Sequence, residues 1–397
     1  MRNIVIVDSV RTAIGKIGGT LGNETVDKLG EHIIRALIDK TGIERETIGE
    51  VILGQAKQSS DVSNLARVAS LRAELPMQIP GYTIHRQCGS GVQAVNSAAQ
   101  QIQSNLSDII IAGGAESMST APYYVNGVRF GLKSGNIELK DPNTASQPGS
   151  QPTEKYGDLN MGLTAENVAE KYRITREEQD EFALKSQEKT KNAIEKGYFE
   201  NEISPYPVKT RKSSINFKVD EHPRETTLNK LEKLKPVFKE GGTVTAGNAS
   251  GRNDGAAALL VMAEESAIEH AFQPKVKILA QAAAGVSPKT MGMGPVEATL
   301  KALKQTNLTI QDIGIIELNE AFASQSIACI KELGLDINRV NPNGGAIAMG
   351  HPIGATGAIL LTKLIHELER TGEKYGLVTL CIAGGMGITT IVENLQV

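Results

Sequence analysis

The sequence lacks several features that would place it in other classes of protein. It has no tryptophan, 4% aromatic residues and three cysteines among 397 residues, with no Cys-x-x-Cys pair and no cysteine–histidine spacing typical of a zinc site. Such sparse cysteines argue against a disulfide framework and favour reduced thiols in the cytoplasm. The net charge of -3 gives no reason to expect binding to nucleic acid or to a membrane. No signal peptide, membrane-spanning run or peroxisomal Ser-Lys-Leu end is recognisable.

The hydrophobic and charged fractions of the sequence are typical of a large globular protein. Hydrophobic residues make up 40% of the chain and charged residues 22%. A chain of 397 residues exceeds one ordinary hydrophobic core, so we expect two or three domains.

Cys88 lies where a short extended run, residues 81–87, changes to small residues and then to a helical pattern. Apolar residues recur at helical spacing from Val92 to Ile102, so we expect a helix to begin at or just after Cys88. The unpaired N–H groups and positive dipole end of that helix favour the thiolate, which makes Cys88 a candidate nucleophile. A buried structural cysteine explains the local pattern equally well.

A second signal, near the end of the chain, favours the functional interpretation. His351 and Cys381 lie in the glycine-rich segments 350–357 and 379–387. Turns so rich in glycine allow a ligand to approach the backbone, and an ordinary core has no need of a histidine or a cysteine there.

The two halves of the sequence resemble each other. The strand-like phrases at 48–56 and 109–115 recur in the same order at 313–321 and 379–386, with the glycine-rich helix openings 88–91 and 354–357 between them. We infer two fused copies of one α/β unit. If the copies pack about a pseudo-twofold axis, Cys88 and the turns that carry His351 and Cys381 converge at one interface.

Between the halves, from about Thr120 to Gly247, the sequence reads as an insertion with a small fold of its own. Thr175, with Glu178 three residues later, predicts the capped start of a helix that closes near Gly197. A basic stretch follows, and it contains Lys209, Arg211, Lys212, Arg224, Lys230 and Lys235. A solvated face accounts for these cations, and so does a site for an anionic group such as a nucleotide phosphate.

Two more segments have a plain structural explanation. The small residues of 242–256 suit a backbone that lies against a ligand, but a tight crossover back to the first domain explains them as well. Asn319 ends an apolar run and therefore reads as a helix N-cap.

Taken together, the motifs resemble those of the thiolases over essentially the whole chain. Several separated motifs in the order of the family are far more specific than any one of them. The motifs are Val10–Gly15, Cys88–Gly91, Ala112–Ser119, Met161–Val168, Thr245–Gly251, Asn319–Phe322, Gly350–Pro352 and Cys381–Gly387.

The resemblance implies the α/β thiolase fold, with duplicated domains in a five-layered α-β-α-β-α arrangement and an inserted loop domain. It implies an N-terminal domain at 1–119 plus 248–271, a loop domain for CoA binding and tetramerisation at 120–247, and a C-terminal domain at 272–397. The loop from Ala121 to Lys140 is similar to the tetramerisation segment of the family and implies a homotetramer, a dimer of dimers.

The resemblance also implies reversible carbon–carbon cleavage or condensation of a 3-ketoacyl-CoA. Cys88 would hold the acyl group as a thioester, and His351 would activate Cys88 and, with a water held by Asn319, stabilise the enolate oxygen. Cys381 would shuttle the proton, and the backbone N–H groups of Cys88 and Ala383 would form the oxyanion hole.

Physical chemistry supports this set of residue types. Cleavage beside a carbonyl needs donors already in place for the enolate oxygen. A soft cysteine nucleophile forms a thioester and releases it again readily. The second cysteine suits a base whose neighbours lower its pKa toward neutrality.

Substrate contacts are implied at seven further positions: Met161, Arg224, Ala246, Ser250, Met291, Ala321 and Phe322. Cys329, in an apolar helical stretch, is expected to be core. Departures from the common family pattern are His85, Asn160, Arg252, which replaces an apolar residue, and Ala383, which keeps the backbone N–H. These departures leave the preferred acyl chain length open, and they do not alter the residues implied in catalysis.

The function that we predict is acetyl-CoA C-acetyltransferase, which condenses two acetyl-CoA to acetoacetyl-CoA and CoA in fatty acid metabolism. A degradative 3-ketoacyl-CoA thiolase of broader chain length shares all the chemistry and differs in tunnel depth. A non-catalytic carrier of acyl-CoA or lipid is the third possibility, and the intact Cys88, His351 and Cys381 speak against it. No metal or bound cofactor is implied, because CoA itself is substrate and product.

Overall fold

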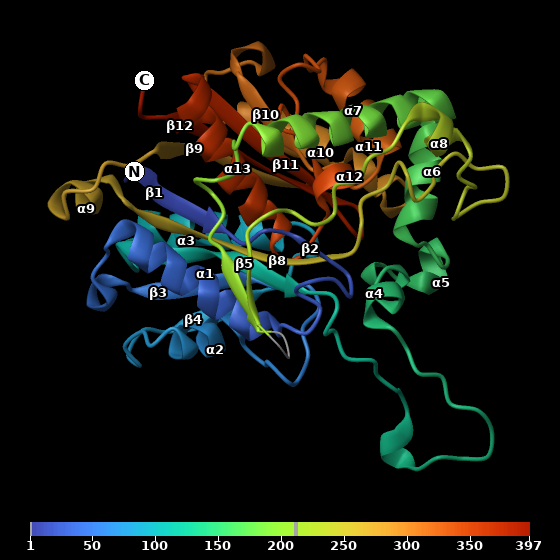
Figure 1. The fold of residues 1–397 in the computed structure, drawn as a ribbon, viewed down its shortest axis with the longest axis horizontal. Coiled ribbons are helices and arrows are strands. Elements are labelled where there is room, and N and C mark those ends of the chain that lie inside the picture. The colour runs from blue at the N-terminus through green and yellow to red at the C-terminus, as the bar shows by residue number, and fades with distance from the viewer. Residues whose placement is uncertain (1, 210–212) are drawn as a thin grey trace.

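The computed structural model describes residues 2–209 and 213–397 and is built around one large mixed sheet (Figure 1). Its strand order is β10-β11-β12-β9-β1-β8-β5-β3-β4, and the short β2 pairs with β8. The strands are β1 (Ile4–Arg11), β2 (Gly15–Lys16), β3 (Glu50–Gly54), β4 (Gly81–Ile84), β5 (Ile109–Ser117), β8 (Asn253–Ala263), β9 (Val276–Gly285), β10 (Ile315–Leu318), β11 (Tyr375–Ile382) and β12 (Met386–Asn394).

The sheet consists of two similar halves. In the first half β3 pairs in parallel with β5, and in the second β10 pairs in parallel with β11. Within the sheet of the described residues, the halves are joined between β1 and β9, where Val5 pairs with Lys277 and Ile6 with Val276. The paired phrases of the sequence are therefore equivalent strands in a duplicated unit.

Alternating side chains on the strands face different helix layers. Val51 and Leu53 belong to a core with the helices α1 (Val26–Thr41) and α2 (Leu65–Arg72), whereas Ile52 belongs to a core with α3 (Ser90–Gln103) and α13 (Thr356–Thr371). In the other half Val378 joins that same middle core, and Leu377 joins an outer core with α10 (Gly294–Leu303) and α11 (Ala323–Leu333). The predicted order of layers, α-β-α-β-α, is confirmed.

The two middle helices touch backbone to backbone where they begin. A Cβ built on Gly91 would lie 2.8 Å from the backbone N of Ala358, and one built on Gly357 would lie 2.4 Å from the backbone N of Val92. Only glycine permits so close an approach. Because both helices begin at this contact, the residues that precede them, Cys88 and His351, are drawn together.

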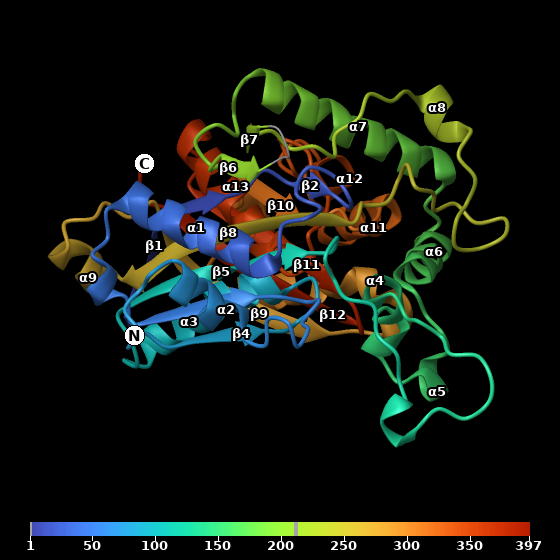
Figure 2. The same cartoon turned by 60° about the horizontal axis from the view of Figure 1, so that its bottom comes forward.

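The segment between β5 and β8 forms the insertion, and its two longest helices pack against α11 at one side of the molecule (Figures 1 and 2). Its elements are α4 (Pro142–Ala145), α5 (Thr153–Tyr156), α6 (Met161–Tyr172), α7 (Arg176–Glu195), β6 (Tyr206–Lys209), β7 (Ser214–Phe217) and α8 (Leu228–Glu232). The predicted capping box at Thr175 and Glu178 is present at the start of α7. The loop of residues 121–140 projects away from the body in both views.

A buried ion cluster fastens the insertion to the first strand. Arg11 is fully buried and binds Glu202 at 2.7 Å and Asp220 at 2.8 Å. Of the basic stretch predicted from the sequence, Arg211 and Lys212 lie outside the described residues. None of the helices in residues 2–209 and 213–397 is long and apolar enough to cross a membrane.

The remaining helices are short. They are α9 (Glu264–Glu269), α12 (Ala346–Met349) and the 3-10 turns Arg45–Thr47, Val128–Phe130, Pro148–Ser150, Pro288–Met293 and Ile310–Asp312.

Candidate active site

Cys88, His351 and Cys381 meet at the carboxyl ends of the parallel strands, and Asn319, at the same edge of the sheet, is not among the residues that line their cavity. Cys88 follows β4, Asn319 follows β10, and Cys381 and Ala383 lie at the end of β11. Ligands of open α/β sheets characteristically bind at this edge. A cavity of about 180 Å³ is lined there by Cys88, His351, Cys381 and Ala383.

Cys88 lies on a tight turn between β4 and α3. The residue before it, Gln87, has a φ of +45°, an uncommon conformation for a residue with a side chain, and the hydroxyl of Ser90 braces the turn by donating to the carbonyl of Gln87 at 2.6 Å. The predicted helix start is confirmed, since α3 begins at Ser90.

The charge state of Cys88 differs from the prediction. Removal from water raises the pKa of the Cys88 thiol, and this outweighs the backbone N–H of Ala383 and the charge of Lys57, which act in the opposite direction. Cys88 is therefore a neutral thiol in the unliganded site, and it needs a base.

His351 can supply that base. It is buried, and burial together with the charge of Lys57 lowers its pKa to about 4, so that the imidazole is neutral at physiological pH. Its Nδ1 lies 2.7 Å from the hydroxyl of Thr356, and its Nε2 has no hydrogen-bond partner within the described part of the chain.

The backbone of His351 is fixed as firmly as its ring. Gly350 has a φ of +101°, and a Cβ there would lie 2.3 Å from Cγ of Asn253. The side-chain oxygen of Asn253 in turn accepts the backbone N–H of His351 at 2.9 Å. The glycine before the histidine is thus required both by conformation and by space.

The structure overturns the expected pKa of Cys381. Its side chain is fully buried, and burial, with the neighbouring Cys88 thiol as a second cause, raises its pKa well above the ordinary value. The prediction of a pKa lowered toward neutrality is wrong for the unliganded protein, because a pattern of glycines does not reveal how completely a thiol is removed from water.

Asn319 is not a helix N-cap. The next helix, α11, begins four residues later, and Phe322 occupies its N-cap position. Asn319 is fully buried, and neither its amide nitrogen nor its oxygen has a hydrogen-bond partner among the described residues. Buried amides without partners are rare outside functional sites.

Glu320, the residue after Asn319, is also buried. Its carboxylate accepts hydrogen bonds from Ser186 at 2.6 Å, Asn341 at 2.9 Å and the backbone of Ile347 at 3.3 Å. It binds the insertion to the loop that leads to His351, which is an orienting arrangement.

Five of the seven predicted substrate contacts line the cavity: Met161, Ser250, Met291, Ala321 and Phe322. The other two, Arg224 and Ala246, lie outside it and are joined by a hydrogen bond of 2.7 Å from the guanidinium to the carbonyl. Arg224 instead borders a separate open cleft, together with Lys230.

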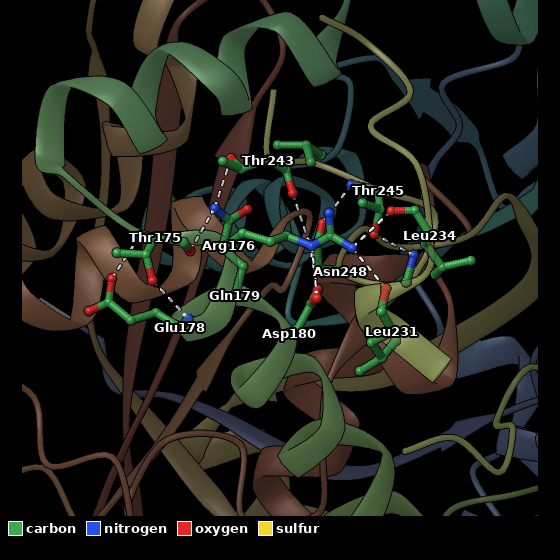
Figure 3. Close-up of polar contacts among 12 residues, drawn as sticks. Thr175, Arg176, Glu178, Gln179, Asp180, Leu231, Leu234, Thr243, Thr245 and Asn248 are labelled. Atoms are coloured by element: carbon green, nitrogen blue, oxygen red, sulfur yellow. Dashed lines mark hydrogen bonds and ion pairs between the residues drawn. The ribbon is translucent and has the colours of Figure 1, made fainter. Parts of the chain in front are cut away.

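The segment that leads to Ser250 is held by α7 (Figure 3). The side chain of Asn248 donates to Asp180 at 2.9 Å and accepts from the backbone of Thr245 at 2.8 Å, while Gln179 donates to Thr243 at 2.9 Å. Beyond Asn248 the backbone of Ser250 donates to Ala321 at 3.0 Å. The segment 242–256 therefore brings residues to the cavity wall as well as returning the chain to the sheet.

The positions that depart from the family pattern have different surroundings. His85 is exposed at the end of β4, and Asn160 caps α6 by accepting the backbone N–H of Leu163 at 2.9 Å. Arg252 lines the cavity and donates to Thr144 at 3.1 Å. Cys329 is fully buried in the outer core, as expected.

Sequence reasoning missed Lys57, Gln87 and Ser146, which also line the cavity. No local motif singles out Lys57. A signal was nevertheless available, because β3 and β4 are parallel and Gly54 pairs with Ile84, so the residues just after each strand lie at the same edge. Within the described residues no group of three or more His, Cys, Asp or Glu could hold a metal ion.

A duplicated five-layer α/β fold, with two thiols and a neutral histidine around one cavity, defines an acyl-transferring enzyme. Family models agree over nearly the whole chain: the thiolase N-terminal domain matches residues 4–265 and the thiolase C-terminal domain matches residues 272–394. The chain belongs to the thiolase family.

Individual relatives cover the chain from end to end. It is 46% identical to the acetyl-CoA acetyltransferase of Rhizobium meliloti over 99% of both chains. Its structure is similar to that of Bacillus anthracis acetyl-CoA acetyltransferase, with a TM-score of 0.97 and 45% identity over 100% of this chain and 99% of the other. It is also similar to human mitochondrial 3-ketoacyl-CoA thiolase in complex with CoA, with a TM-score of 0.94 and 42% identity over 99% and 98% of the chains.

Proposed function

We propose that this acyltransferase is an acetyl-CoA C-acetyltransferase that condenses two acetyl-CoA to acetoacetyl-CoA and CoA, reversibly, through an acyl thioester on Cys88. The observation that carries the proposal is the convergence of Cys88, His351 and Cys381 on one cavity. Relatives named acetyl-CoA acetyltransferase support the choice of substrate.

In the cleavage direction, His351 takes the proton of Cys88 at Nε2, and the sulfur attacks C3 of acetoacetyl-CoA. The C2–C3 bond breaks, and its electron pair leaves on the acetyl-CoA enolate, which Cys381 protonates. The backbone N–H groups of Cys88 and Ala383 face the C3 oxygen, and His351, with a water held by Asn319, faces the enolate oxygen. Preorganised donors of this kind stabilise the charge that develops in the transition state.

In the second step free CoA releases the acyl group. The Cys381 thiolate takes the proton of the CoA thiol, the CoA sulfur attacks the thioester carbonyl, and Cys88 leaves and recovers its proton from His351. Because burial raises the pKa of Cys381, the thiolate that remains after the first step is a strong base and readily takes the proton of the CoA thiol.

The second candidate is a degradative 3-ketoacyl-CoA thiolase of broader chain length, and the human mitochondrial 3-ketoacyl-CoA thiolase supports it. The third candidate is a non-catalytic carrier of acyl-CoA or lipid. It gives no role to Nε2 of His351 or to the buried amide of Asn319, which have no hydrogen-bond partner among the described residues.

The remaining parts of the proposal concern the insertion and the assembly. We propose the domain division 1–119 plus 248–271, 120–247 and 272–397, with Arg224 and Ala246 contacting CoA outside the cavity. The exposed apolar side chains of the loop 121–140, of which Phe130 is 94% exposed, support assembly into a homotetramer through that loop. We place the enzyme in the cytoplasm because its cysteines are unpaired.

Thiolysis kinetics test the proposal with three proteins: the native enzyme, Cys88→Ala and Cys329→Ala. Cys88→Ala should lose at least about a thousandfold in kcat, whereas Cys329→Ala, which alters only the core, should remain active. A strong preference for acetoacetyl-CoA over a medium-chain 3-ketoacyl-CoA supports the acetyltransferase, and equal or better use of the longer chain supports the degradative enzyme. Absence of any Cys88-dependent turnover supports the carrier.

A further inference from the structure

A buried lysine lies in the wall of the catalytic cavity. Lys57 follows β3 and is only 7% exposed, and it shares the cavity with Cys88 and His351. A lysine is almost never so deeply buried without a partner of opposite charge. Its position in an acyl pocket therefore calls for an explanation.

Among the described residues, the hydrogen-bond partners of the Lys57 ammonium are neutral. The ammonium donates to the hydroxyl of Ser146 and to the carbonyl of Pro142 at 3.3 Å, and the ion pairs of these residues do not include it. The buried carboxylate of Glu116 stabilises the ammonium electrostatically, but its oxygens accept the backbone N–H groups of Ala56, Lys57 and Gly354 at 2.8 to 3.0 Å rather than the ammonium. An ammonium has three donors, so Lys57 keeps one for another acceptor.

A second cation lies on the same wall. The guanidinium of Arg252 lines the cavity and is 3.5 Å from Asp141, a distance at which the pair is weak. Asp141 also caps α4 by accepting the backbone N–H of Asn143 at 2.8 Å. Glu116 and Asp141 thus offset the charges of Lys57 and Arg252, but neither cation is held in a short ion pair within the described residues.

The lining of the cavity includes an apolar group and a polar group. Met161, Phe238, Met291 and Phe322 belong to a single apolar cluster. Among the polar lining residues, Lys57 donates to Ser146, Gln87 donates to Ser150 at 3.2 Å, and Arg252 donates to Thr144 behind the wall. The apolar group suits an uncharged arm, and the polar group suits an anion.

We propose that the cavity accepts a 3-ketoacyl-CoA whose acyl chain ends in a carboxylate, with Lys57 and Arg252 binding that carboxylate. The proposal rests on the Cys88 chemistry proposed above and extends it to a longer, anionic acyl group. The phosphates of CoA do not compete for this site, because the pantetheine arm separates them from the acyl group, at whose C3 Cys88 reacts. Charge-assisted hydrogen bonds to a carboxylate are among the strongest polar contacts available to a buried ammonium.

The reaction balances without a further reactant. Cys88 attacks C3, the C2–C3 bond breaks, and the electron pair leaves as the acetyl-CoA enolate, which takes its proton from Cys381. The ω-carboxyacyl group remains on Cys88 until the sulfur of CoA displaces it, and the proton of the CoA thiol returns to Cys381. The products are acetyl-CoA and an ω-carboxyacyl-CoA.

A matched pair of substrates tests the proposal: 3-oxoadipyl-CoA and 3-oxohexanoyl-CoA have the same chain length and differ in a terminal carboxylate against a methyl group. With the native enzyme, kcat/KM in thiolysis should be at least about tenfold higher for 3-oxoadipyl-CoA. In Lys57→Met this ratio should fall by about tenfold or more, and in Lys57→Arg, which keeps the charge, it should be largely retained. Arg252→Met should lower the ratio less, because Arg252 is already near Asp141.

Acetoacetyl-CoA, assayed with every protein, separates this proposal from the proposed function. A native ratio of one or less, with acetoacetyl-CoA still cleaved, overturns the carboxylate site and leaves the enzyme assignment intact. Equal losses for all three substrates in Lys57→Met, with an unchanged melting temperature, also overturn it, because the loss then does not depend on the terminal carboxylate. Absence of Cys88-dependent turnover of every substrate defeats the proposed function itself. The native ratio decides the question even if Lys57→Met does not fold.

Discussion

The hydroxyl of Thr356 fixes the tautomer of His351. That hydroxyl has a single hydrogen, and it lies 2.9 Å from the carbonyl of Pro352, to which it donates. It can therefore only accept from Nδ1 of His351, 2.7 Å away, so Nδ1 carries the proton. The lone pair is left on Nε2, the nitrogen without a partner, which is the form that a general base requires.

Removal of this hydroxyl should impair catalysis more than folding. In Thr356→Val the Nδ1–H of His351 loses its acceptor, so the ring is no longer held in one tautomer. We expect kcat for thiolysis of acetoacetyl-CoA to fall by about tenfold or more, with KM little changed. Thr356→Ser is the matched control and should keep most of the activity; a similar loss in both variants would contradict the tautomer argument.

On the acid side of the pH profile, kcat/KM should fall at an unusually low pH; we call this fall the acid limb. The imidazole of His351 must be neutral to act as a base, and burial and Lys57 lower its pKa to about 4. The value of kcat/KM for acetoacetyl-CoA should therefore persist well below the ordinary histidine pKa of about 6.5 and fall only as the pH approaches 4. Loss of a positive charge favours the protonated ring, so Lys57→Met should move this limb to higher pH. A limb that stays in place in Lys57→Met would show that Lys57 does not act on His351.

Alkylation should distinguish the three cysteines. Cys88 is partly exposed, whereas Cys329 and Cys381 are fully buried, and burial raises the pKa of Cys329 to about 12. Iodoacetamide added to the folded protein should label Cys88 first, and labelling should slow in the presence of acetyl-CoA. Mass spectrometry of tryptic peptides measures the site. Rapid labelling of folded Cys88→Ala at either other cysteine would contradict the burial described here.

The contact between the two middle helices predicts a stability effect. Gly91→Ala places a methyl group 2.8 Å from the backbone of Ala358, which neither helix can avoid without moving. We expect a loss of about 1 to 3 kcal/mol in the free energy of unfolding, with reduced activity because Cys88 and His351 move apart. Gly149→Ala, where nothing lies within 4 Å, is the control and should be close to neutral. Chemical denaturation followed by circular dichroism measures both.

The buried ion cluster of Arg11 should contribute more to the free energy of unfolding than the surface ion cluster of Arg2. Arg11→Met leaves the buried carboxylates of Glu202 and Asp220 without their partner, at a cost of about 3 to 5 kcal/mol. Arg2→Met removes pairs to the exposed Asp108 and Glu265 and should cost less than about 1 kcal/mol. Equal effects in thermal unfolding would show that the Arg11 cluster does not secure the insertion.

Features encoded in short stretches of sequence could be predicted. The start of α3 after Cys88 follows from apolar spacing, and the duplication follows from repeated phrases, so the layers and the meeting of Cys88 with His351 were within reach. The capping box of Thr175 is equally local.

Features that depend on three-dimensional surroundings could not be predicted from the sequence. The pKa of Cys381 depends on complete burial, which its glycine-rich turn does not encode. The position of Asn319 at the end of an apolar run predicts a helix N-cap, but Phe322 occupies the N-cap position of α11. Lys57 has no motif, and only the parallel pairing of β3 with β4 places it beside Cys88.

The division of the site between two joined half-sheets has a consequence for biosynthesis. A nascent chain that has emerged as far as β8 contains Cys88 but neither His351 nor Cys381, and β11 is completed only when β12, the last strand, pairs on its far side. The thiol is therefore synthesised well before the two residues that we propose as its proton carriers. We expect thioester chemistry only after the second half-sheet has folded.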